Sequence, residues 1–364
     1  MRVLVTSPRR LGHVQPLVPL ARALVARGNE VLWALPPEGV PFVEGAGLRA
    51  VPVGMPGMID PRKVADDPAL AGLSAAEVPE VLFAKLFAGV AAPLMLTDME
   101  PLVHEWRPEL LVADAAELAG HLAAIQVGIP SVTKGFGPLL PEPRVAAVDA
   151  ELAPLWRSRG IEPRPYGGSY EHLYLDVYPP EMQAGPAETP HVPRRQLLRP
   201  VSDDAGVEEW AAPPLPEGRP GAPLVYLTMG TVFNAEGPLR TALAGLAGLD
   251  VRVLVTVGPL ADPGVLGAQP AHVRVERYVP QSQMLASCDA VVSHGGSGTV
   301  LATLAHGLPQ LCLPQGADQF LNAVERLLVE DSFRRSATSV AASIEAMPSA
   351  DDVAAVLEAL AWGS

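Results

Sequence analysis

The chain has 364 residues, of which 49% are hydrophobic and 18% are charged. This length suits two α/β domains, and this composition excludes a disordered chain. The formal net charge of −14 argues against nucleic acid and against an anionic membrane surface as partners, because clustered Lys and Arg side chains bind both.

The N-terminus and the two cysteines indicate the compartment. Residues 2–6 are strand-like from the start, which leaves no room for a signal peptide, and no apolar run reaches the length of a membrane span. Cys288 and Cys312 both lie in apolar settings without metal-ligand spacing. We therefore expect a cytoplasmic protein in which both cysteines are reduced core residues.

The first half of the chain alternates strands with helices, as in a parallel sheet with right-handed crossovers. Residues 55–80 form a long loop with a capped helix start, and the strand at 129–133 is expected to close the first core. Strands are predicted at 3–6, 30–34, 48–53, 110–114 and 129–133, and helices at 15–27, 40–46, 81–103, 118–126 and 139–156.

Two polar residues of this half lie at the carboxyl ends of strands, His13 after the first strand and Asp114 as the last residue of another. His13 lies in the loop after the first strand, where a histidine is either a capping or surface residue or a general base, since its ordinary pKa is about 6.5. Asp114 ends the strand at 110–114, and it either orients that imidazole or caps the following helix. Both alternatives stay open on the residues alone.

The second half begins after a Pro-rich, acidic run, residues 200–223, which is predicted to be a semi-rigid surface linker. A new series of strands and helices follows it, and a last helix is predicted at 353–360. The strands are predicted at 224–228, 251–257, 273–279, 289–293 and 310–314, with helices at 237–246 and 281–286 and a third after Thr299.

A glycine-rich turn stands at the centre of this half. The strand at 289–293 runs into His294-Gly295-Gly296-Ser297-Gly298-Thr299, and a helix follows. Such a turn presents backbone N–H groups and the positive end of a helix dipole, which favour a diphosphate. No GxxxxGK[ST] loop is present, and the loop after the first strand lacks GxGxxG. The alternative is a structural turn with a polar helix cap.

This run, with Asp318-Gln319 one strand later, resembles the nucleotide-sugar signature of bacterial natural-product glycosyltransferases of the GT-B fold. The resemblance covers essentially the whole chain, and it implies a strand at 172–178, which resembles the family strand that precedes the crossover. It implies two doubly wound Rossmann-like α/β domains that face each other across a cleft. The implied parts are an acceptor-binding domain at 1–199, a linker at 200–223, a nucleotide-sugar-binding domain at 224–350 and a C-terminal helix at 351–364 that packs back on the first domain.

The resemblance also implies roles for single residues. His13 corresponds to the general base of the family, because it lies in a Gly-His loop ahead of the helix that carries Pro16 to Ala21. Asp114 corresponds to the partner of that base. Asp318 and Gln319 fall on the residues that hold the sugar. The other donor-binding positions are Thr231 in a turn, Val279 and Gln281 at the loop that reads the base, and His294, Gly296, Ser297, Gly298 and Thr299 at the diphosphate.

The implied reaction is an inverting, metal-independent transfer of a sugar to a small lipophilic acceptor. The donor would be a TDP- or UDP-activated sugar, in particular a deoxysugar, and the acceptor an aromatic or polyketide-like molecule of antibiotic biosynthesis. The donor is a co-substrate and no further cofactor is expected; a homodimer stays open. The alternatives are a non-catalytic GT-B-like partner or binding protein, and a nucleotide-sugar epimerase with a carboxylate base in place of the Gly-His loop.

One departure from the family lies at Arg326 and Leu327, where the family normally carries a Gly-rich strand and a turn. A helix could run through, because Phe320, Val324 and Leu327 share one face. Omission of a strand would, however, leave a hydrophobic sheet edge. We therefore expect a mobile loop here that the printed sequence skips, and an unbroken helix through both residues would contradict this expectation.

Overall fold

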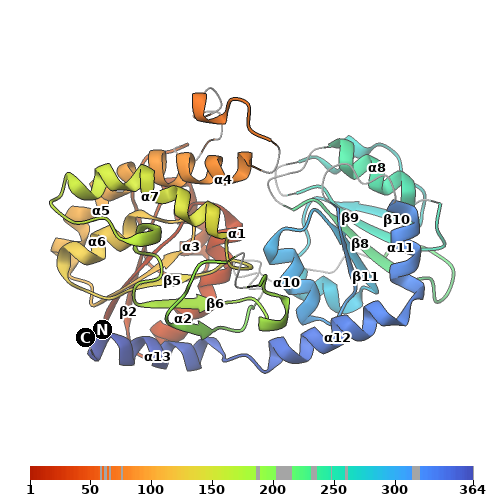
Figure 1. Cartoon of the computed structure of the whole chain (residues 1–364). Helices are drawn as coiled ribbons and strands as arrows, with labels where there is room; N and C mark the ends of the chain where they lie inside the picture. Colours follow the sequence, from red (N-terminus) through yellow and green to blue (C-terminus); the bar gives the residue numbers. More distant parts are fainter. Residues whose placement is uncertain are drawn as a thin grey trace. The chain divides into compact units, whose positions relative to one another are not determined.

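The structure is a computed structural model that describes residues 1–57, 60, 64, 67–74, 77–185, 189–201, 215–230, 236–246, 248–258, 261–313 and 320–363. The chain divides into two compact units (Figure 1). Unit 1 consists of Met1–Arg199 and Pro348–Ser364, and unit 2 consists of Pro200–Met347. Each unit contains one parallel sheet with helices, which confirms the predicted α/β class.

Within the described residues, the sheet of unit 1 has seven strands in the order β3-β2-β1-β4-β5-β6-β7, all paired in parallel. Because β1 lies between β2 and β4, the order of strands reverses there, and doubly wound sheets bind ligands beyond the carboxyl ends of the strands at such a point. The strands are β1 (Arg2–Thr6), β2 (Glu30–Leu35), β3 (Ala50–Pro52), β4 (Leu110–Asp114), β5 (Ser131–Lys134), β6 (Leu173–Asp176) and β7 (Arg195–Leu197).

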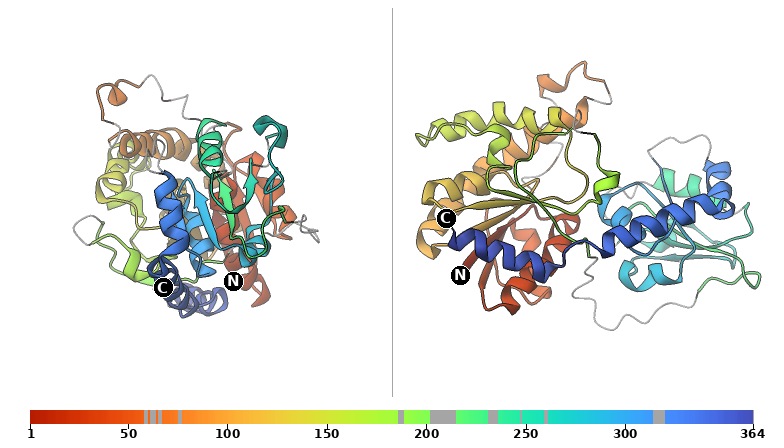
Figure 2. Two further views of the ribbon diagram at one scale, coloured as in Figure 1. Left: turned by 90° about the vertical axis from the view of Figure 1, so that its right-hand side faces the viewer. Right: turned by 60° about the horizontal axis from the view of Figure 1, so that its bottom comes forward.

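The helices of unit 1 connect these strands and cover the sheet (Figure 2). The α-helices are α1 (Leu11–Val14), α2 (Val18–Ala26), α3 (Val40–Gly45), α4 (Val78–Phe83), α5 (Ala92–Trp106), α6 (Ala119–Val127), α7 (Glu142–Arg157) and α13 (Ala350–Trp362). The 3-10 helices are η1 (Gln15–Leu17), η2 (Pro37–Gly39), η4 (Pro68–Leu70), η6 (Pro165–Gly168) and η7 (Pro180–Met182), and η5 (Ala84–Ala91) is a π-helix.

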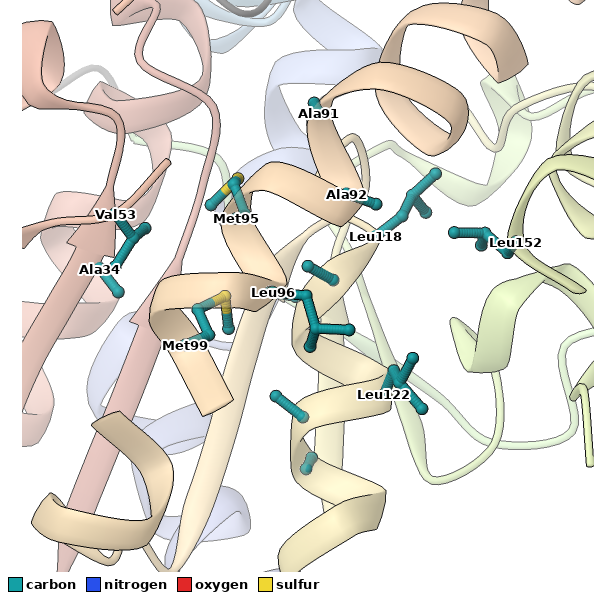
Figure 3. Close-up of a cluster of buried hydrophobic side chains, with 14 of the residues drawn as sticks. Ala34, Val53, Ala91, Ala92, Met95, Leu96, Met99, Leu118, Leu122 and Leu152 are labelled. Carbon is teal, nitrogen blue, oxygen red and sulfur yellow. The ribbon is translucent and has the colours of Figure 1, made fainter. Parts of the chain in front are cut away.

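A hydrophobic cluster packs α5, α6 and α7 onto one face of this sheet (Figure 3). Leu96 from α5 lies near its centre, Leu122 from α6 and Leu152 from α7 belong to the same cluster, and all three are fully or almost fully buried. The central strand β4 is buried along its whole length, as expected for a parallel strand with helices on both faces. This core fixes the carboxyl end of β4, where Asp114 lies.

The long helical segment Val78–Trp106 corrects one expectation. It joins α4, η5 and α5 into 29 residues, and by length and composition alone it is apolar enough to cross a membrane, so the expectation that no apolar run is long enough is wrong. The reason is that charged residues are sparse, with at most two in an 18-residue window. In the structure, its buried side chains, including Leu86, Met95 and Met99, pack into the core of unit 1.

The sheet of unit 1 also extends beyond the strand that was expected to close the first core. β6 pairs with β5, and β7 pairs with β6. β6 agrees with the strand predicted at 172–178, whereas β7 was missed. It is only three residues long, and Arg195-Gln196-Leu197 carries neither an apolar run nor an alternating pattern.

The last helix of the chain, α13, packs against α2 in unit 1 (Figure 1). Its first turn is closed by a capping box, in which the side chains of Ser349 and Asp352 accept each other's backbone N–H groups. Glu358 faces α2, where one carboxylate oxygen accepts from Arg27 at 2.7 Å and the other from Asn29 at 2.7 Å. The helix is thereby joined to unit 1 by both apolar and ionic contacts.

In unit 2, the described ranges contain a five-stranded parallel sheet in the order β10-β9-β8-β11-β12. One hydrophobic cluster packs α8 and α11 onto one face, and a second packs α9 and α10 onto the other. The strands are β8 (Leu224–Thr228), β9 (Arg252–Thr256), β10 (Val273–Glu276), β11 (Ala290–Ser293) and β12 (Gln310–Cys312). The helices are α8 (Glu236–Leu246), η8 (Pro263–Leu266), α9 (Gln281–Met284), η9 (Leu285–Ser287), α10 (Ser297–Ala305), α11 (Phe320–Val329) and α12 (Asp331–Glu345).

Two further expectations are corrected in unit 2. α11 runs unbroken through Arg326 and Leu327, which contradicts the expectation of a skipped loop. Leu327 is buried, whereas Arg326 is exposed and pairs with Glu330 at 2.6 Å, so the helical spacing of apolar residues carries the chain through. Cys312 is exposed and therefore not a core residue, because β12 lies at the end of the strand order; Cys288 is buried as expected, and both cysteines are free.

Candidate functional site

In unit 1, the predicted site begins at the carboxyl end of β1. The chain turns there into the short helix α1, which starts with the His13 N–H donating to the Arg10 carbonyl at 2.8 Å. The His13 ring contacts Phe136 edge-on, with centroids 4.9 Å apart and an interplanar angle of 72°. This packing holds the imidazole in one orientation, with its side chain 17% exposed.

His13 and Asp114 meet at this edge of the sheet. Nδ1 of His13 lies 2.9 Å from Oδ1 of Asp114, which also accepts the Ala116 N–H at 2.9 Å. Asp114 is fully buried. Because a carboxylate only accepts hydrogen bonds, the proton of a neutral imidazole resides on Nδ1, and Nε2 carries the free electron pair. The pair can therefore take up a proton at Nε2.

The alternative role of Asp114, as the cap of α6, belongs to another residue. Glu117 accepts the N–H groups of Ala119 at 2.8 Å and Gly120 at 3.1 Å, and it also accepts the Thr6 hydroxyl at 2.6 Å. Burial raises the pKa of the Glu117 carboxyl. Sequence reasoning missed Glu117, because glutamate is not among the residues Ser, Thr, Asp and Asn that usually cap the start of a helix.

In unit 2, the glycine-rich turn joins β11 to α10 as predicted. Gly296 is the N-cap of α10, with extended backbone angles, and no described side chain caps the helix. The first N–H groups of a helix have no acceptor within it, and the helix dipole makes this end positive. The backbone at Ser297, Gly298 and Thr299 therefore offers donors suited to an anion.

The His294 ring is held between two glycines. A Cβ atom on Gly230 would lie 2.4 Å from His294 Cε1, and one on Gly296 would lie 2.5 Å from His294 Nε2. Gly230 also has a φ of +76°, which side chains rarely adopt. Burial lowers the pKa of His294, which favours the neutral imidazole.

Two of the other predicted donor-binding residues contact each other. Gln281 opens α9, and its amide donates to the Thr299 hydroxyl at 3.1 Å, while Thr299 itself is 8% exposed. Val279 is buried in the core of unit 2, so only its backbone is available to a ligand. Gly298 is exposed, and a Cβ atom there would meet no atom of the described residues within 4 Å beyond its own helical turn.

Three predicted residues lie outside the described residues, namely Thr231, Asp318 and Gln319. The predicted site residues that the structure does describe form one group in each unit. Across the described ranges, no group of three or more His, Cys, Asp or Glu side chains is placed to hold a metal ion.

Comparisons with known proteins follow the same division of the chain. Residues 22–211 match the N-terminal domain model of the erythromycin biosynthesis protein CIII-like family, and residues 240–327 match its C-terminal domain model. The chain is 37% identical to an L-demethylnoviosyl transferase from Streptomyces niveus, over 98% of this chain and 88% of the relative. It is 29% identical to the aclacinomycin-T 2-deoxy-L-fucose transferase of Streptomyces galilaeus, over 99% of this chain and 97% of the relative.

The fold of a solved glycosyltransferase structure also matches this chain over nearly its whole length. The spinosyn rhamnosyltransferase SpnG in complex with thymidine diphosphate is 28% identical and superposes with a TM-score of 0.80, covering 98% of this chain and 100% of that one.

Proposed function

The chain belongs to the EryCIII-like family of glycosyltransferases, and from this premise we propose that it transfers a deoxysugar from a TDP-sugar to a hydroxyl group of a polyketide-like aglycone. The observation that carries the mechanism is the 2.9 Å contact between His13 Nδ1 and Asp114 Oδ1. The donor class is supported by the relative named for a 2-deoxy-L-fucose and by the neighbour bound to thymidine diphosphate.

In this proposal, His13 is the general base. Its Nε2 takes the proton of the acceptor hydroxyl while the oxygen attacks the anomeric carbon, and Asp114 stabilises the resulting imidazolium. The attack comes from the face opposite the leaving diphosphate, so the configuration of the sugar inverts. The sugar passes through a state with oxocarbenium character, as in glycoside hydrolysis.

The start of α10 receives the departing diphosphate. Its backbone N–H groups, the hydroxyls of Ser297 and Thr299 and the neutral imidazole of His294 are donors, and the helix dipole adds positive potential. Thr299 is oriented by the Gln281 amide. Because these groups compensate the developing charge, we propose that no divalent metal takes part. Activity should then survive a chelator, and a strict magnesium requirement would contradict this part.

The decisive experiment incubates the purified protein with TDP- and UDP-sugars and a set of polyketide aglycones, and it follows nucleoside diphosphate release and the mass of the product. We expect a glycosylated aglycone with wild type and almost none with His13→Ala. His104→Ala is a matched control, because His104 is an exposed histidine of the same unit. Binding of TDP without transfer to any acceptor would favour the non-catalytic binding protein, and interconversion of sugars without acceptor would favour the epimerase.

A further inference from the structure

Lys134 is a buried cation that the mechanism above does not use. It ends β5, its side chain is fully buried, and its Nζ has no hydrogen-bond partner among the described residues. Its neighbour in the parallel register is Asp114 at the end of β4, so the two side chains lie on the same face of the sheet. Oδ2 of Asp114 is likewise buried without a partner.

An unpaired ammonium in a protein core is unfavourable, because water no longer solvates it and nothing replaces the lost hydrogen bonds. A methionine would fill similar space without that penalty. Burial lowers the pKa of Lys134 to about 8, and the nearby Asp114 carboxylate opposes this shift. At neutral pH the Lys134 side chain is therefore positively charged in most copies of the protein. This charge lies beside Asp114, and its burial does not stabilise the fold.

The other ionisable groups near this carboxylate do not supply such a charge. Burial raises the pKa of the Glu117 carboxyl, which favours its neutral form, and burial also keeps the pKa of the Tyr174 phenol well above its usual value. Asp176, at the end of β6, pairs with Arg195 from β7. Two cationic side chains flank Asp114 directly, namely Lys134 opposite it in the register and, when protonated, His13 in contact with it.

We propose that Lys134 is a positioning residue of the His13–Asp114 pair, whose ammonium compensates the Asp114 carboxylate and thereby sets how readily the imidazole takes up a proton. The inference rests on the proposed role of His13 as the base. With Lys134 in place, its positive charge cancels part of the field that the Asp114 carboxylate exerts on the imidazole. Without it, the full negative charge of Asp114 acts on the ring, which then binds a proton at higher pH.

The test is the pH at which His13 titrates in Lys134→Met and Lys134→Gln, followed by NMR of the imidazole C–H signals, together with the pH profile of kcat/KM. We expect the His13 titration and the acidic limb of the profile to move to higher pH by about one unit, as expected for loss of a nearby buried charge. Lys134→Arg keeps a cation and should restore both. Lys85→Met is the matched control, because Lys85 pairs with Glu151 at 2.8 Å and lies in the same unit.

The two readouts separate this inference from the proposed function. A shifted NMR titration with a pH profile that does not follow it would support Lys134 and remove His13 as the base. An unshifted His13 titration in both neutral variants would overturn the role of Lys134, whatever the activity does. A shift that Lys85→Met reproduces would also overturn it, because the effect would then not depend on the place of the charge.

Discussion

The His294 ring occupies the space that a side chain on Gly296 would need, because a Cβ atom on Gly296 would lie 2.5 Å from His294 Nε2. The family resemblance placed this glycine at the diphosphate, where added bulk would meet the ligand. The structure shows that the first collision is with the protein's own imidazole. A substitution at 296 therefore acts on the ligand through His294.

The first prediction compares Gly296→Ala with Gly298→Ala. At 296 the new methyl group displaces the His294 ring, so both melting temperature and TDP affinity should fall. At 298 the new methyl group meets no atom of the described residues beyond its own helical turn, so stability should hold or rise. TDP affinity should fall, by about tenfold if the methyl group crowds a bound diphosphate as overpacking crowds a core. Calorimetry and thermal melts measure both. Unchanged affinity in Gly298→Ala would remove the start of α10 from the diphosphate site.

The second prediction concerns the two members of the base pair. His13→Ala should lower kcat by about 10² to 10⁴-fold, the usual range for a positioned general base. Asp114→Asn should lower it in the same direction, because a neutral amide does not stabilise the imidazolium. TDP affinity should stay unchanged in both variants. If Asp114→Asn only lowers the melting temperature and leaves kcat intact, Asp114 has a structural role alone.

The third prediction is the pH dependence of stability that Lys134 causes. Its pKa falls from 10.5 when unfolded to about 8 when folded, so the unfolded state binds more protons between these values and the unfolding free energy rises with pH there. Below pH 8 the buried charge costs about 3 kcal/mol by this shift. Lys134→Met should thus be more stable at pH 7, with the gain shrinking towards pH 10.5. Urea titrations at pH 7 and 9.5 measure this; a variant destabilised equally at both would contradict it.

The fourth prediction concerns the attachment of α13. Hydrogen bonds from Arg27 and Asn29 lower the pKa of the Glu358 carboxyl, so its contribution is present above the ordinary glutamate pKa and is lost as the pH falls through the folded value. Glu358→Gln should melt at a lower temperature than wild type at pH 7, and the two melting temperatures should converge as the pH falls through the folded pKa of Glu358. Glu330→Gln, which removes an exposed partner of Arg326, should change little at either pH.

The strands most accurately predicted from the sequence are those buried on both faces. β4 and β8 have the predicted bounds, because each is a continuous apolar run that ends at a polar residue. β7 could not be found this way, since three residues with two polar side chains give no pattern. The exposure of Cys312 was missed for a related reason, because a local apolar sequence does not reveal which strand ends a sheet.

The site was predicted in part. The glycine turn and the Gly-His loop were found because each is a run of neighbouring residues in the sequence. The residues alone did not decide whether Asp114 is the partner of His13 or the cap of the following helix. The capping by Glu117 and the 2.9 Å contact of Asp114 with His13 settle the geometry. Lys134 was missed because a lysine that follows an apolar strand resembles a surface residue, and only the register opposite Asp114 and its complete burial reveal its surroundings.

The last helix of the chain belongs to the unit that is made first. Val353, Ala354 and Leu357 are buried where α13 packs on α2, so residues 1–199 alone leave that surface uncovered. During synthesis the ribosome completes the whole of unit 2 before residues 348–364 emerge, although domains generally fold in the order in which they are made. Unit 1 therefore stays incomplete until residues 348–364 have been made. Premature termination anywhere in the second unit would expose the first one to chaperones and proteases as well.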